Sequence, residues 1–124
     1  MKYKVIEKSN PLRLAESKKQ YASPVNTGKF TIKDFAREIA GRSSLTRGDI
    51  ENVLNNFVDV LPPFLKLGLS VQLGEFGTMR LTLSSEGVPA DEKFDASKIK
   101  GTKLVFTPGT DLKAALKDIF FEEA

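Results

Sequence analysis

Apolar residues recur with helical spacing in two stretches of the first half of the chain. The first stretch runs from Thr31 to Gly41 and the second from Thr46 to Gly68. Each opens with a Thr followed three residues later by an Asp, which resembles a capping box that satisfies free backbone N–H groups. Each ends at a Gly, the usual residue just beyond a helix. We therefore predict two amphipathic helices, with apolar faces formed by Ile32, Phe35, Ala36, Ile39 and by Ile50, Val53, Leu54, Phe57, Val58, Leu61, Phe64, Leu65, Leu67.

The second predicted helix contains the pair Pro62-Pro63. Proline has no N–H to donate, and its ring clashes with the preceding turn of a helix. We therefore expect a kink or a break at this pair.

Alternation of apolar and polar residues replaces helical spacing after Gly68. Residues 69–73 and 79–83 alternate as half-buried strands do, and residues 74–77 (Gly-Glu-Phe-Gly) predict a tight reversal between them. A polar excursion over 84–101 leads to a third strand at 102–106. A last helix then opens at Thr107-Pro108, with an apolar face that continues to Ile119 and Phe120.

The N-terminal segment has a different pattern. Residues 1–8 alternate as a strand does, and Asn10-Pro11 is expected to end it. Residues 11–29 are polar and predict an extended arm or linker, with a second strand near Val25 or Phe30 as an alternative. The sequence thus predicts a basic extension at 1–29 and an α+β domain at 30–124.

Composition excludes several classes of function. The 124 residues include no Cys and no His, so the usual nucleophiles, bases and zinc ligands are missing. We therefore expect no catalytic residue, no metal site, no cofactor and no small-molecule substrate. No stretch is as apolar as a membrane span or a signal peptide. The predicted protein is a cytoplasmic binding protein and not an enzyme.

The charge is unevenly distributed. The whole chain has a net charge of +3 and a pI of about 9.2. Residues 1–30 contain seven Lys or Arg and two Glu, a net +5, whereas residues 84–101 contain three Lys and four acids, a net −1. Because attraction to an anionic partner follows local charge, the N-terminal segment is expected to contribute more to such binding than the excursion.

The order and spacing of these elements resemble the HU and integration-host-factor family of bacterial histone-like DNA-binding proteins, over about residues 30–121. The basic extension resembles that of an HU-like variant found in Bacteroidetes. Four segments carry the resemblance: Phe30–Ala36, Leu45–Gly68, Val71–Met79 with its Gly-Phe-Gly turn, and Phe106–Leu116.

The resemblance implies an HU-like (IHF-like) α+β fold: two N-terminal helices, a three-stranded antiparallel sheet with a long β-arm, and a C-terminal helix, in an intertwined homodimer. It also implies largely sequence-independent binding of double-stranded DNA by phosphate neutralisation, and DNA condensation in the nucleoid. In the family, cations of the arm line the minor groove and a Pro at its tip wedges between base pairs.

The arm of this chain departs from the family pattern. Residues 84–101 contain no Arg, and the arginine–asparagine–proline tip is absent. Pro89 is the only Pro in the arm, and it is the candidate wedge, with an ordinary turn as the alternative. The four acids of the arm support a second hypothesis, an HU-like dimer that has lost strong DNA binding and contacts protein partners.

The candidate DNA-binding residues are cations in the extension, the strands, the arm and the last helix. Each has a simpler interpretation as a solvated charge. They are Lys2, Lys4, Lys18, Lys19, Arg80, Lys93, Lys98, Lys100, Lys103 and Lys113.

Two backbone segments are further candidates. The turn at Gly74–Gly77 and the helix start at Thr107–Thr110 both offer N–H groups to a phosphate. The alternatives are a plain turn with Phe76 in the core and simple capping of the helix. The apolar faces exceed what one copy of this small fold covers, which favours a dimer.

Overall fold

A computed structural model describes residues 1–9, 11–13 and 17–124. The chain divides into two units, each described by itself below. The first unit comprises Met1–Thr31 together with Lys117–Ala124, and the second comprises Ile32–Leu116. The division at Thr31 lies next to the expected end of the extension at residue 29, but the last eight residues group with the N-terminal segment.

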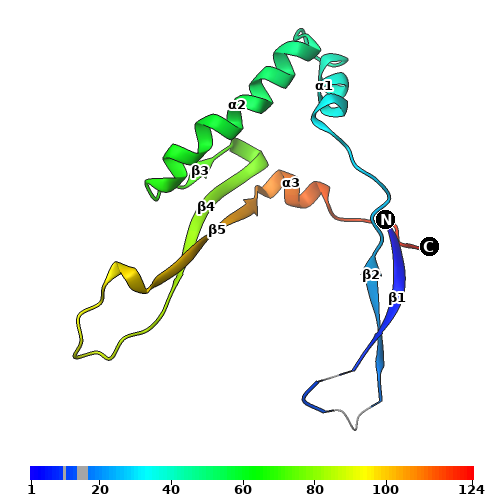
Figure 1. The fold of residues 1–124 in the computed structure, drawn as a ribbon. Helices are drawn as coiled ribbons and strands as arrows, with labels where there is room; N and C mark the ends of the chain where they lie inside the picture. The colour runs from blue at the N-terminus through cyan, green and yellow to red at the C-terminus, as the bar shows by residue number, and fades with distance from the viewer. Residues whose placement is uncertain (10, 14–16) are drawn as a thin grey trace. The chain divides into compact units, whose positions relative to one another are not determined.

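The second unit combines helices with an antiparallel sheet, which confirms the predicted α+β class (Figure 1). Its sheet has the order β3-β4-β5, and the β4–β5 hairpin continues into a long loop. The elements are α1 (Ile32–Ala40), α2 (Arg47–Lys66), β3 (Val71–Gln72), the 3₁₀ helix η1 (Gly74–Phe76), β4 (Gly77–Ser85), the 3₁₀ helix η2 (Ala96–Lys98), β5 (Ile99–Pro108) and α3 (Thr110–Ala115).

Helix α2 has the caps that the sequence predicts. The Asp49 N–H donates to the Thr46 hydroxyl at 3.1 Å, and the Thr46 N–H donates to the Asp49 carboxylate at 3.3 Å. At the other end Gly68 has a φ of +84°. Its N–H donates to the Leu65 carbonyl, and the next N–H, from Leu69, donates to the Phe64 carbonyl. This is the Schellman arrangement, which satisfies carbonyls at a helix end.

Of the kink or break expected at Pro62-Pro63, the break does not occur, because α2 continues through both prolines to Lys66. The pair lies in the last turn and a half of the helix, so only a short segment follows the missing backbone donors. Leu65, which follows the pair, is buried, and this packing holds the final turn in place.

Two glycines bring η1 against β5 and α3. Gly77 has a φ of +143°, and a Cβ there would overlap the Thr107 carbonyl oxygen. A Cβ on Gly109 would overlap the carbonyl of Glu75. The Gly109 N–H donates to the Phe76 carbonyl at 3.1 Å. The predicted reversal at residues 74–77 is confirmed, and it closes onto the start of α3.

The prediction that the last helix continues to Phe120 is wrong. Helix α3 ends at Ala115, where the Leu116 N–H donates to the Leu112 carbonyl. Asp118 has a φ of +60°, which cannot continue a right-handed helix. The chain beyond it forms the two-residue strand β6 (Glu122–Glu123), so its backbone groups pair in a sheet instead.

The first unit is a three-stranded sheet with the order β2-β1-β6. Strand β1 (Lys2–Lys8) is as predicted, whereas β2 (Lys19–Pro24) lies earlier than the expected second strand. The two strands pair antiparallel from Tyr3↔Pro24 to Lys8↔Lys19, and β6 pairs parallel with the start of β1. Asn10, where the first strand was expected to end, and residues 14–16 of the expected linker lie outside the described residues.

In the described ranges, no helix has the length and apolar character needed to cross a membrane. The same ranges contain no group of three Asp or Glu side chains arranged to hold a metal ion.

The close approach at Gly109 yields a stability prediction. Gly109→Ala should destabilise the fold by about 1–3 kcal/mol, because the new methyl overlaps the Glu75 backbone. Gly87→Ala is the matched control, since nothing lies within 4 Å of a Cβ there, and it should change stability by less than about 0.5 kcal/mol. Urea unfolding at one protein concentration measures both, and equal effects would contradict the packing described.

Candidate nucleic-acid interface

Register places two candidate cations on one face of the β4–β5 hairpin. Arg80 pairs with Val105 and Lys103 pairs with Thr82, two residues along, so all four side chains share a face. Arg80 and Lys103 are exposed. Neither β4 nor β5 contains an Asp or Glu. The face is therefore basic and free of competing acids.

The opposite face of the same hairpin is apolar. Met79 pairs with Phe106 and Leu81 pairs with Leu104. Met79 lines a hollow together with side chains of α2, which places this face on the helical side of the unit. By alternation, Arg80 and Lys103 lie on the side turned away from α2.

The acids of the arm are confined to its loop. Residues 86–98 hold all four of them against Lys93 and Lys98. Hydrogen bonds order the base of this loop: the Glu86 N–H donates to the Lys98 carbonyl at 2.8 Å, and the Ser97 N–H donates to the Asp95 carboxylate at 3.0 Å. Lys100 lies beside a shift in register after Ser84. The strands that lead into the arm, with Arg80, Lys100 and Lys103, are thus basic, and the loop at residues 86–98 is acidic.

Pro89, the candidate wedge, opens a turn in this loop. The Glu92 N–H donates to the Pro89 carbonyl at 3.0 Å, and Pro89 is exposed. Asp91 and Glu92 belong to the same turn, and the negative potential of a minor groove repels their carboxylates. The turn therefore explains the proline without a wedge, and the wedge stays a prediction.

The start of α3 is capped from within the chain. The Asp111 N–H donates to the Glu75 carboxylate at 3.4 Å. A carboxylate at this position occupies the donor and repels a phosphate, so the capping alternative is favoured for Thr107–Thr110. Lys113 lies on α3 and is exposed, three residues after this helix begins.

The candidate cations of the N-terminal segment belong to the first unit. Lys2 and Lys4 lie on β1, Lys19 opens β2, and Lys18 immediately precedes it. Sequence reasoning missed Tyr21, which lies on β2 opposite Ile6 and is exposed. The alternation over residues 19–23 was the only sequence signal for a strand here. Two lysines and a glutamine directly before Tyr21 left this segment without an apolar face.

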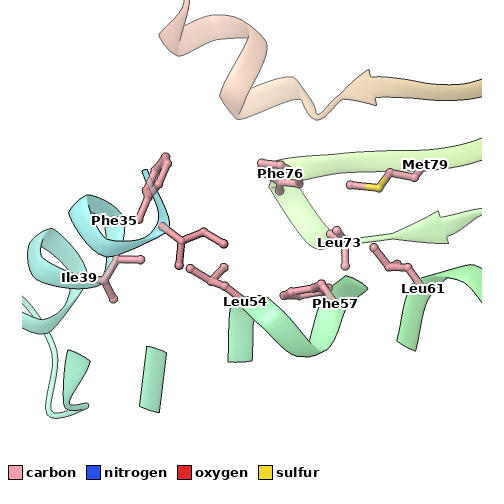
Figure 2. A pocket seen from close by; sticks show the side chains of 9 residues that line it. Phe35, Ile39, Leu54, Phe57, Leu61, Leu73, Phe76 and Met79 are labelled. Atoms are coloured by element: carbon pink, nitrogen blue, oxygen red, sulfur yellow. The ribbon is translucent and has the colours of Figure 1, made fainter. Parts of the chain in front are cut away.

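An apolar hollow of about 710 Å³ opens between the helices and the sheet of the second unit. Figure 2 shows Phe35 and Ile39 from α1, three side chains of α2, and Phe76 and Met79 from the strand side pointing toward it. Its lining is Ile32, Phe35, Ile39, Leu54, Phe57, Leu61, Leu73, Phe76 and Met79.

The single chain buries little of this apolar surface. Among the described residues, only Ala36, Ile50 and Leu65 are buried hydrophobic residues. Phe76 contacts Phe106, with ring centroids 5.0 Å apart, yet it stays 52% exposed. Within the single chain no element of the same unit covers the hollow, so a core position for Phe76 stays a prediction that depends on a second copy.

Most of the large hydrophobic side chains of α1 and α2 stay exposed in the single chain. They are Ile32, Phe35, Val53, Phe57, Val58, Val60 and Phe64.

Comparison with known proteins identifies relatives over most of the chain. Residues 1–123 match the protein family HU-HIG, described as "HU domain fused to wHTH, Ig, or Glycine-rich motif". The chain is also 36% identical over 88 residues to "DNA-binding protein HU" of Lactococcus lactis subsp. lactis (strain IL1403). That match covers 68% of this chain and 96% of the relative.

A solved structure shares the fold. It comes from Bacteroides vulgatus ATCC 8482, and its protein is described as a bacterial DNA-binding protein. The TM-score is 0.58 at 16% sequence identity, and the match covers 98% of this chain. This chain spans about half of the solved one, 47% of its length.

The hollow yields a second prediction, tested by two phenylalanines of similar exposure. Phe76 lines the hollow, and Phe94, 48% exposed, lies in the arm loop. If the hollow is covered in solution, Phe76→Ala should cost about 3–5 kcal/mol, the usual cost for a core Phe, and Phe94→Ala much less. Denaturant unfolding measures both. A destabilisation below about 1 kcal/mol for Phe76→Ala would show that the ring stays in solvent.

Proposed function

The chain belongs to the HU-HIG family of HU-like proteins, and from that premise we propose that it is an architectural protein that binds double-stranded DNA with little sequence preference. Binding proceeds by neutralisation of phosphates and release of counterions. Association with the nucleoid, condensation of DNA and a cytoplasmic location complete this proposal.

The observation that carries the proposal is the acid-free face of the β4–β5 hairpin. Arg80 and Lys103 share this face with Thr78 and Thr82, whose hydroxyls are also donors to phosphate oxygens. Strand side chains on one face form a regular row of donors, which suits the regular row of phosphates on a duplex. Lys100 and Lys113 extend the positive charge at either end of β5, while Lys93 and Lys98 lie among the acids of the loop.

We further propose that the hollow is covered by a second copy of the chain. The lining is continuous and apolar, from two helices and the sheet, and a homodimer brings two identical faces together. The apolar character of the lining is typical of obligate dimers, whose interfaces resemble a domain core.

One observation favours a second function, that of a dimeric protein-interaction module. The arm loop holds four acids against two lysines and leaves Phe94 exposed, a combination suited to a protein partner. This function predicts no binding to duplex DNA even at low salt, so a titration at two salt concentrations separates the two proposals.

The DNA proposal predicts the effect of neutralising the hairpin face. Arg80→Gln with Lys103→Gln should lower the slope of log affinity against log salt by about 1.8, because each phosphate that is no longer neutralised lowers it by about 0.9. Fluorescence anisotropy with a labelled duplex at three salt concentrations measures this slope. Arg42→Gln with Lys66→Gln, exposed cations of the helical side, is the control with the same change in charge. Equal slopes for the two variants would reject the hairpin face as the DNA-binding surface.

The dimer proposal predicts the mass in solution. Sedimentation equilibrium at micromolar concentration should give about twice the chain mass of 13.7 kDa, because a single copy leaves the hollow in water. A single species of 13.7 kDa at this concentration would reject the proposed dimer.

A further inference from the structure

The register of the first unit separates charge between its two faces. Lys4 pairs with Ser23, Ile6 with Tyr21 and Lys8 with Lys19. Residues paired across antiparallel strands share a face, and successive even positions of β1 share it too. The lysines of both strands therefore lie on one face, here called the ribbon face: Lys2, Lys4, Lys8 and Lys19, with Ile6, Tyr21 and Ser23.

The other face is apolar and carries the acid of β1. Tyr3, Val5 and Glu7 lie there, opposite Pro24, Ala22 and Gln20. Met1, Tyr3, Pro24 and Phe121 line a second hollow. Glu122, which pairs with Lys2, is the one acid that register places on the ribbon face among the described strands.

We propose that the ribbon face is a second DNA-binding surface of the chain, which contacts the phosphate backbone of a duplex independently of the β4–β5 hairpin. The proposal rests on the proposed function, and it assigns the role of the extension to one face of one sheet. Its partner is the phosphate backbone, since the face presents ammonium groups and a phenol hydroxyl and no apolar area of its own beyond Ile6.

The pairing of Lys8 with Lys19 points to an anion. Like charges directly opposite each other destabilise an antiparallel pair. Within the described residues the structure records no ion pair for Lys2, Lys4, Lys8 or Lys19. A phosphate near the Lys8–Lys19 pair would supply a counter-charge, so repulsion in the free sheet becomes attraction in the complex.

Spacing along β1 fits a duplex. Lys2 and Lys8 are six residues apart, which is about 20 Å along a strand. A duplex carries a phosphate for each ~1.7 Å of its axis when both DNA strands are counted, so about a dozen phosphates lie within that length, and those on the near side are within reach of the strand. Tyr21 adds a hydroxyl, one of the side-chain groups that bind phosphate oxygens.

Protection of a sheet edge is the competing explanation, since lysines on an exposed edge prevent pairing with other chains. Edge protection is served by a lysine on either face of a strand. It does not account for the concentration of all four on one face while Glu7 lies on the other. Binding to a single extended polyanion accounts for it, because only the cations on one side of the sheet can face the same duplex.

A charge-neutral ribbon face tests the proposal in the full chain. The test variant combines Lys2→Gln, Lys4→Gln, Lys8→Gln and Lys19→Gln. The control combines Lys33→Gln, Arg42→Gln, Arg47→Gln and Lys66→Gln, with the same reduction of charge in the helical region. Circular dichroism first checks the fold, and anisotropy with a duplex of about 40 base pairs then gives the salt slope. The test variant should lower the slope by about 3.6, or 0.9 per lysine, and the control much less.

A register swap keeps the composition and net charge unchanged. Lys4→Val with Val5→Lys moves one cation to the apolar face, and it should lower the slope by about 0.9. If the fourfold test variant unfolds, the swap and the single change Lys19→Gln replace it, each with an expected drop of about 0.9. No binding by the parent protein would reject the proposed function itself. Binding by the parent with an unchanged slope in the variants, or an equal drop in test and control, would overturn the ribbon face alone.

Discussion

The uncovered apolar face of the second unit is the constraint on which the rest of the structure depends. Two helices and a small sheet meet around a hollow that no element of their own unit fills. Because exposed apolar area is costly in water, this face is the basis of the proposal that a second copy of the chain covers it. Three features hold the elements around this hollow in place. They are the capping box at Thr46, the Schellman turn at Gly68 and the glycine contacts that hold η1 against the start of α3.

The β4–β5 hairpin has one apolar face and one basic face, and the basic face is the one suited to a polyanion. The apolar side of β4 and β5 is committed to the hollow, so strand alternation leaves Arg80 and Lys103 on the other side, without an acid among the strand residues. The acids that made the arm look unsuited to DNA lie in its loop, where Asp95 caps a 3₁₀ helix and Glu86 pairs through its backbone. The net charge of the arm therefore reflects its acidic loop, whereas the strands β4 and β5 that lead into it are basic.

The sequence predicted the elements with local signals and missed those that depend on distant partners. The capping box, the helix-ending glycines and the turn at residues 74–77 each involve neighbours within a few residues, so their patterns were readable. Strand β6 forms because the N–H groups of Glu122 and Ala124 donate to the carbonyls of Met1 and Tyr3, at the other end of the chain. No pattern of neighbouring residues predicts that pairing. The same holds for the ribbon face: the lysines were visible in the sequence, but only the β1–β2 register shows that they share a side.

DNA is proposed to contact the side of β4 that is turned away from the helices. The chain has no cysteine, so a photo-crosslinker can be attached at one introduced position. Thr82→Cys places it on the Arg80 face, and Leu81→Cys places it one residue away on the apolar face. Crosslinking to a duplex is expected from position 82, and much less from position 81. Crosslinking from position 81 with none from position 82 would contradict it.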